Sequence, residues 1–159
     1  MLGIFDVETS PMSYFIRLLD WVGFSKFNLP FQGQQKGVPA DFKGNKLTSD
    51  KMRYKQWASY FQTTPRLRVG PATIGWTSQA MHAMSFVNRN AAMVKIPGLI
   101  IAAGGDPIVD PASNRRFSEL SGLDFSIVPG ALHELFLERD EYRNRFLSEI
   151  DDFLVRNAL

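Results

Sequence analysis

Two residues of this sequence have the side-chain types and the positions for proton-transfer chemistry. Asp106 follows Ala103-Gly104-Gly105, and His133 follows Val128-Pro129-Gly130-Ala131-Leu132. A carboxylate beside an imidazole fixes the tautomer of the ring and stabilises its protonated form. Such an imidazole can take the proton of a serine hydroxyl and make the oxygen a nucleophile. Asp106 and His133 are therefore candidates for the acid and the histidine of a catalytic triad.

The segments around these two residues indicate a parallel sheet. Residues 98–103 form a short unbroken apolar run, which is typical of a strand covered on both faces. Residues 124–128 indicate a second strand, Pro111 opens a helix between the two, and an amphipathic helix closes the chain. Functional groups gather beyond the carboxyl ends of parallel strands, and neighbouring strands lie about 4.8 Å apart. This βαβ order predicts that the two side chains come within hydrogen-bond reach of each other.

The part of the chain up to about residue 93 has the pattern of helices joined by loops. Apolar residues at helical spacing predict a helix over residues 13–24. Residues 28–45 are rich in Gly, Pro, Gln and Lys, which predicts a loop. A second helix is predicted to start within residues 47–50, where Ser and Asp are good N-cap types, and to run to about Gln62.

A third helix is predicted after Gly70-Pro71, and it carries apolar side chains on two faces. One stripe consists of Trp76, Ala80, Ala83 and Val87, and the other of Ile74, Met81 and Met84. A helix of this kind is buried or lines a groove. Trp76, Met81 and Met84 are more typical of a core, but a flat indole and flexible thioethers also suit a slot for an acyl chain. These three are therefore our candidate substrate-binding residues.

The segment from Ile96 to about Leu154 resembles the end of α/β-hydrolases of the lysophospholipase and monoacylglycerol lipase type, a family similar to the S33 serine aminopeptidases. In that family a strand followed by G-x-D-x-x-x-D carries the triad acid, and P-G-A-x-H-E-L carries the triad histidine. The same letters stand here around Asp106 and His133, and the acid precedes the histidine as in the superfamily. The resemblance implies that these two residues are catalytic.

The resemblance also implies a fold. The beginning of the chain, Met1-Leu-Gly-Ile4, is similar to the family's sequence where it leaves the strand after the nucleophile and enters a cap. The implied fold class is α/β. We expect a helical cap or lid over residues 1–93. Over residues 94–159 we expect the C-terminal part of an α/β-hydrolase core, with the last βαβα unit of its parallel sheet.

The nucleophile of the family is missing from the sequence. The G-x-S-x-G motif, which places a serine on a tight strand-to-helix turn, does not occur. Gly23-Phe-Ser25-Lys-Phe27 has Phe in place of the second glycine and follows a helix, and Gly75-Trp-Thr-Ser78 has the wrong spacing. A complete fold of this type needs roughly 250 residues. We therefore expect a truncated chain that is inactive alone.

Other polar residues have plainer interpretations. Asp110 is the nearest rival of Asp106, but Asp110-Pro111 suits a helix N-cap. His82 is interpreted as an ordinary helix residue. The acids after His133 are interpreted as helix N-terminal residues that face the helix dipole. They are Glu134, Glu138, Asp140 and Glu141.

The function implied by the resemblance is hydrolysis of a monoacyl lipid ester, such as a lysophospholipid or monoacylglycerol, as a small-molecule substrate. No metal or organic cofactor is expected. The alternatives are another α/β-hydrolase, that is, a peptidase or carboxylesterase, or a non-catalytic binding module, or a truncated gene product without function. Fold alone does not decide among them.

The composition limits the other kinds of chemistry and of binding partner that the sequence could support. A net charge of +2 gives no argument for nucleic acid as a partner, and the absence of cysteine excludes thiolate catalysis and disulfides. The sequence has no run of about 18 apolar residues, so no transmembrane helix is expected. No signal peptide is visible, so a cytoplasmic protein is expected.

Overall fold

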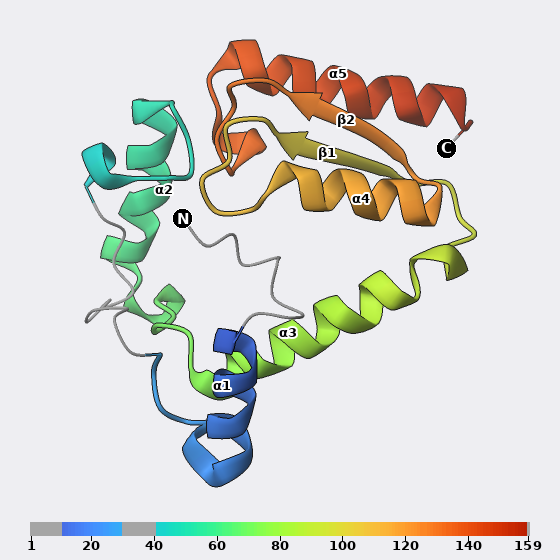
Figure 1. Cartoon of the computed structure of the whole chain (residues 1–159). Coiled ribbons are helices and arrows are strands. Elements are labelled where there is room, and N and C mark those ends of the chain that lie inside the picture. The colour runs from blue at the N-terminus through green and yellow to red at the C-terminus, as the bar shows by residue number, and fades with distance from the viewer. Residues whose placement is uncertain (1–10, 30–40, 159) are drawn as a thin grey trace. The chain divides into compact units, whose positions relative to one another are not determined.

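The computed structural model describes residues 11–29 and 41–158. These residues divide into two compact units (Figure 1). The first unit contains residues 11–29 and 58–89, and the second unit contains residues 41–57 and 90–158. The helix α2 (Lys51–Thr63) contributes to both.

The second unit is built on two parallel strands. β1 (Leu99–Ala103) pairs with β2 (Asp124–Val128), in a register that places Leu99 opposite Asp124 and Ala103 opposite Val128. The helix α4 (Pro111–Ser121) connects the strands, and α5 (Asp140–Arg156) follows them. Figure 1 shows these two helices on opposite sides of the sheet. The predicted strand–helix–strand–helix order is confirmed.

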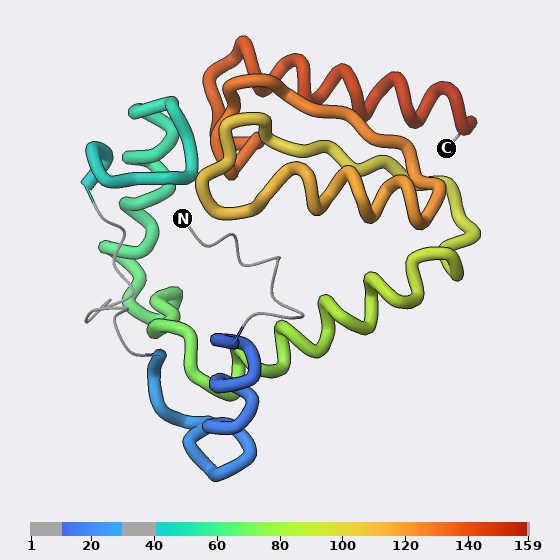
Figure 2. The backbone as a smooth tube through the Cα atoms, in the orientation of Figure 1, coloured from blue at the N-terminus to red at the C-terminus, as the bar shows by residue number. Residues whose placement is uncertain are grey.

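The core of the second unit lies between the sheet and α5. Ala103 and Val128 are paired and buried, and they pack with Phe146 of α5. Ala102 is buried as well, although its side chain points to the other face because neighbouring strand residues alternate. The last residues of both strands are therefore buried, at the end of the sheet from which the two loops leave. Figure 2 shows the loops after β1 and β2 running side by side.

The ends of α4 follow from its sequence. Asp110 is the N-cap, and its carboxylate accepts a hydrogen bond of 3.0 Å from the Ala112 N–H. Pro111 takes the first helical position, where a missing N–H costs nothing. Gly122 ends the helix at φ 75°, a left-handed conformation that glycine adopts without strain. The interpretation of Asp110 as a cap is confirmed.

The first unit contains α1 (Pro11–Leu19) and α3 (Ile74–Arg89), which pack through Ile16, Ile74 and Met81. The single helix predicted over residues 13–24 is wrong at its end. The α-helix stops at Leu19, and a wide π-helical turn over Asp20–Phe24 follows, in which Gly23 has φ 97°. Because this positive φ lies outside the helical region, the backbone cannot continue as a regular helix through Gly23.

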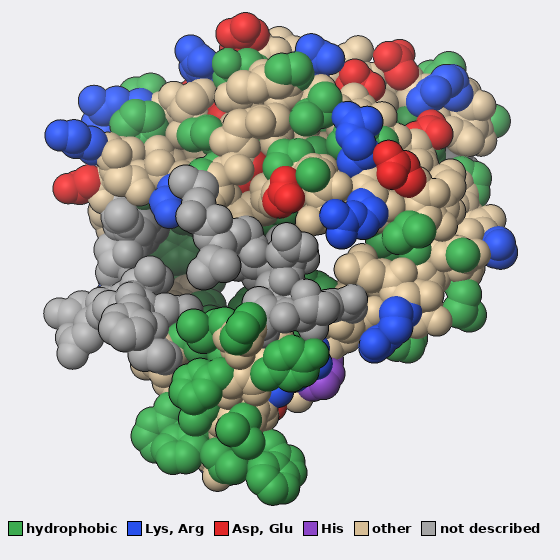
Figure 3. Space-filling view, viewed as in Figure 1, with side chains coloured by type: hydrophobic (Ala, Val, Ile, Leu, Met, Phe, Trp, Pro, Cys, Tyr) green, Lys and Arg blue, Asp and Glu red, His purple; other side chains and the backbone are tan. Residues whose placement is uncertain are grey.

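Apolar side chains remain exposed around α1. Figure 3 shows them gathered on one surface of this part of the chain. They are Met12, Tyr14, Phe15, Leu18, Trp21, Val22, Phe24 and Phe27. Ile16 is the buried apolar residue of this segment, and most of the apolar stripe predicted for residues 13–24 faces outward. Among the described helices, none is long and apolar enough to cross a membrane.

Candidate active site

The loops after β1 and β2 are joined backbone to backbone. The Gly104 N–H donates to the Val128 carbonyl at 2.9 Å, and the Gly105 N–H donates to the Ala131 carbonyl at 2.8 Å. A Cβ atom on Gly104 would lie 2.9 Å from the Cα of Pro129, which is too close for a side chain. The glycine therefore permits the approach that brings the next residue, Asp106, beside the second loop.

Asp106 uses both of its carboxylate oxygens. Oδ2 lies 2.8 Å from His133 Nδ1, and Oδ1 accepts from the N–H groups of Ile108 at 2.8 Å and Val109 at 3.1 Å. Its side chain is only 8% exposed. The two N–H groups hold the carboxylate in one orientation, with Oδ2 directed at the imidazole. The predicted proximity of the two side chains is confirmed.

The pKa of Asp106 is set by opposing effects. Burial raises it, whereas the hydrogen bonds with His133, Ile108 and Val109 lower it, and the pKa lies below its ordinary value. The side chain is therefore a carboxylate at neutral pH. An ionised acceptor at this position favours the His133 tautomer with hydrogen on Nδ1.

His133 is placed to exchange a proton on its other nitrogen. Nδ1 faces Asp106, which leaves Nε2 on the opposite edge of the ring, and the side chain is 29% exposed. The residues on either side are held by their backbone. The Leu132 N–H donates to Glu138 Oε1 at 2.8 Å, and the Glu134 N–H donates to the Leu47 carbonyl at 2.8 Å.

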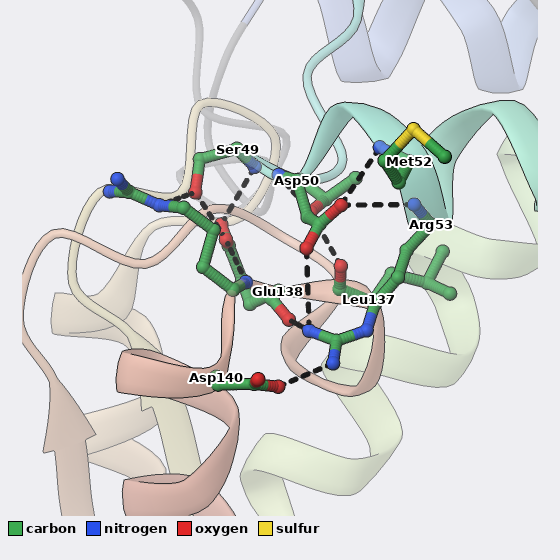
Figure 4. Close-up of polar contacts among 9 residues, drawn as sticks. Ser49, Asp50, Met52, Arg53, Leu137, Glu138 and Asp140 are labelled. Carbon is green, nitrogen blue, oxygen red and sulfur yellow. Dashed lines mark hydrogen bonds and ion pairs between the residues drawn. The ribbon is translucent and has the colours of Figure 1, made fainter.

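Glu138 is a residue whose role the sequence did not indicate. The interpretation of Glu138 as a helix N-terminal residue that faces the helix dipole is wrong, because Glu138 is 0% exposed and precedes the N-cap of α5. Figure 4 shows its carboxylate beside Ser49. Asp140, in contrast, is exposed and pairs with Arg53. Its pKa is lowered, first by the hydrogen bond from Arg53.

The three candidate substrate-binding residues do not form one group. Met81, 7% exposed, belongs to the core of the first unit, and Met84 packs against that core. Trp76 is 66% exposed and lies on another side of α3. His82 of the same helix is also exposed.

The two serines considered as nucleophiles, Ser25 and Ser78, both lie outside a strand-to-helix turn. Ser25 follows the π-helical turn, not a strand, and its hydroxyl donates to the Asp20 carboxylate. This hydrogen bond is the first cause of the lowered pKa of Asp20. Ser78 is buried within α3. Neither stands on a strand-to-helix turn. Within residues 11–29 and 41–158, no cluster of His, Asp and Glu could hold a metal ion.

Comparison with known proteins shows the family of the chain. The model of the family described as serine aminopeptidase, S33, matches residues 8–140. The chain belongs to this family. Lysophospholipase L2 of Escherichia coli strain K12 is 29% identical over 133 residues, which are 79% of this chain and 38% of that protein. The probable lysophospholipase L2 of Haemophilus influenzae is 27% identical over 119 residues, 72% of this chain and 37% of that protein.

Solved structures of the family's fold resemble the chain too. A soluble variant of monoglyceride lipase from Saccharomyces cerevisiae, in complex with a substrate analog, superposes with a TM-score of 0.64 at 19% identity. The matched region covers 98% of this chain and 52% of the lipase. The monoacylglycerol lipase of Paleococcus ferrophilus gives a TM-score of 0.61 at 17% identity, with coverages of 94% and 53%. The chain thus has part of an α/β-hydrolase fold, and it spans less than two fifths of the length of the two lysophospholipases.

Proposed function

We propose that Asp106 and His133 are the acid and the general base of a serine ester hydrolase. The observation that carries this proposal is the 2.8 Å contact between Asp106 Oδ2 and His133 Nδ1, with Oδ1 held by two backbone N–H groups. A carboxylate used only as a turn residue would need the N–H contacts alone. The contact with a partly exposed imidazole is what acid–base catalysis requires.

In the proposed reaction, a serine oxygen attacks the acyl carbonyl of the substrate while His133 Nε2 takes its proton. His133 then returns the proton to the leaving alcohol, and an acyl-enzyme remains on the serine. A water molecule, activated by the same nitrogen, releases the fatty acid. Asp106 stabilises the imidazolium that forms in both steps. No metal or organic cofactor enters these steps.

We propose that the serine comes from sequence outside these 159 residues, because the G-x-S-x-G motif does not occur in them. The 159-residue chain alone should then have no esterase activity. We also propose that residues 1–93 act as a cap and residues 94–159 as part of the catalytic core. The change from the first compact unit to the second at residue 90 supports this division, and residues 41–57 of the proposed cap belong to the second unit.

The proposed substrate is a monoacyl lipid. Two relatives are named lysophospholipases and two solved structures are monoacylglycerol lipases, which supports this substrate class. Trp76, Met81 and Met84 are the proposed contacts of the acyl chain. Trp76 is the most accessible of the three, because the two methionines take part in the core of the first unit.

A second candidate function is aminopeptidase activity, because the matching family is described as serine aminopeptidase, S33. The test uses the chain extended by the coding sequence upstream of residue 1, read in this frame or a shifted one. The extended protein should react with a fluorophosphonate probe and hydrolyse lysophosphatidylcholine or monoacylglycerol, whereas the 159-residue chain should do neither. Cleavage of aminoacyl substrates without cleavage of lipid esters would favour the second candidate.

A further inference from the structure

The buried carboxylate of Glu138 is the shared acceptor of a hydrogen-bond network that includes Ser49 (Figure 4). Oε1 accepts from the N–H groups of Leu132 at 2.8 Å and Ser49 at 3.1 Å. Oε2 accepts from the Arg139 N–H at 3.1 Å and from the Ser49 hydroxyl. A carboxylate offers about four acceptor positions, and all of them are used here.

This network fixes the backbone on one side of His133, and the same distant segment fixes the other side. Leu132, which donates to Glu138, directly precedes His133, and Glu134, which donates to the Leu47 carbonyl, directly follows it. Both connections lead to residues 47–49, about 85 positions earlier in the chain. The position of the imidazole therefore depends on a segment that supplies none of the reacting atoms.

The segment that receives these connections is held in turn. The Thr48 hydroxyl donates to the Leu137 carbonyl at 2.7 Å. The guanidinium of Arg53 donates to the Glu138 carbonyl and to the Asp140 carboxylate. All of these residues belong to the second unit, so the network is internal to one compact body.

We propose that Glu138 is a positioning residue for His133. It sets the backbone of the His133 loop so that Nδ1 faces Asp106. Asp106 is anchored independently by Ile108 and Val109, so loss of the Glu138 carboxylate should move the histidine and leave the acid in place. Without that carboxylate, the backbone N–H groups of Leu132, Ser49 and Arg139 would lose their acceptor, and the loop would lose its connection to Ser49. The catalytic meaning of this role rests on the proposed function.

The test measures the geometry of the pair and not hydrolysis, so it stays informative if the proposed function fails. The ¹⁵N NMR spectrum of the histidine side chains is recorded on the 159-residue chain at about pH 8, above the ordinary pKa of histidine. His133→Ala assigns the signals, since the chain has two histidines. Asp106→Asn gives the spectrum of His133 without its carboxylate partner. The shifts report the fraction of His133 with hydrogen on Nδ1.

Glu138→Gln keeps the shape of the side chain but turns an NH₂ group toward two donors. In Glu138→Gln, the fraction of His133 with hydrogen on Nδ1 should fall toward the value measured in Asp106→Asn. Glu141→Gln is the matched control, because it makes the same charge change at an exposed position, and it should match the unaltered chain. Ser49→Ala, which removes one donor of the network, should shift the fraction in the same direction by a smaller amount and serves if Glu138→Gln does not fold.

Thermal denaturation of the same variants separates positioning from stability. An unchanged Nδ1–H fraction in Glu138→Gln, with or without a lower midpoint, would show that Glu138 is only a structural residue and would overturn the proposal. If Glu138→Gln does not fold, an unchanged fraction in Ser49→Ala would overturn it in the same way.

Discussion

Asp106 makes two kinds of contact, one with backbone N–H groups and one with the imidazole of His133. The N–H groups of Ile108 and Val109 fix the carboxylate, and His133 uses the oxygen that remains. Because the pKa of Asp106 lies below its ordinary value, the side chain keeps its charge well into the acidic range. A charged Asp106 is what the proposed chemistry needs, since it must stabilise an imidazolium.

The lowered pKa of Asp106 predicts a pH dependence of stability. Its contribution to folding should be complete above its unfolded pKa, about 3.9, and should be lost as the pH falls through the lower folded pKa. At neutral pH, Asp106→Asn should lower the free energy of unfolding by about 1.5–3 kcal/mol, the range for hydrogen bonds to a charged group. Denaturant unfolding of both proteins should show this difference shrinking in acid. A difference that stays constant down to about pH 2 would contradict the cause assigned to the shift.

The sequence was informative where a residue's role depends on its own neighbours. Asp106 and His133 could be predicted because each lies in the loop that follows a strand, and Asp110 because it directly precedes a helix. Glu138 could not, since its partner Ser49 lies 89 positions away. Its burial depends on that tertiary contact. The clue that was available is weak: an acid two residues before a helix, close to His133.

The contact between two loops determines the site at the scale of secondary-structure elements. Gly104 allows this contact, so Gly104→Ala should push the loop backbones apart at Pro129. We expect a loss of about 1–3 kcal/mol in the free energy of unfolding, the usual cost of overpacking. The Nδ1–H fraction of His133 should fall as well.

The control for this change is Gly44→Ala in the same unit, because a Cβ on Gly44 would meet nothing within 4 Å. Thermal and denaturant unfolding of both variants give the comparison. Equal stabilities for Gly104→Ala and Gly44→Ala would show that the loops are not in tight contact.

The N-cap of α4 gives a second prediction at this scale. Asp110→Ala removes the acceptor of the Ala112 N–H and should lower the free energy of unfolding by about 1 kcal/mol. Asp151→Ala, an exposed position within α5, removes the same charge without removing a cap. Hydrolysis by the extended protein should persist in Asp110→Ala. A loss as severe as that of Asp106→Asn would instead make Asp110 the acid.

Some elements could be predicted closely and others could not. The strand Leu99–Ala103 matches its apolar run, and the strand Asp124–Val128 has the bounds predicted for it. The segment 13–24 has helical spacing throughout, yet the α-helix stops at Leu19. A pattern of apolar residues does not report the left-handed conformation that Gly23 adopts. Nor does it report which of the two apolar stripes of α3 is buried.

At the scale of the whole molecule, the acid, the histidine and Glu138 all belong to the second unit. The geometry of the pair is therefore a property of one compact body. The chain spans only part of the length of its relatives, and the sequence contains no G-x-S-x-G motif. The proposed division of labour follows: this chain supplies proton transfer, and another segment supplies the attacking serine.

The measurement that tests this account most directly is the rate of monoacyl ester hydrolysis by the extended protein carrying either His133→Ala or His82→Ala. These are the two histidines of the 159 residues, and His82 lies exposed on α3. If His133 is the general base, His133→Ala should lower kcat by about 10³-fold or more, as expected when a triad histidine is removed, while His82→Ala should stay close to the unaltered rate. A protein that hydrolyses the ester at its full rate without His133 would contradict it.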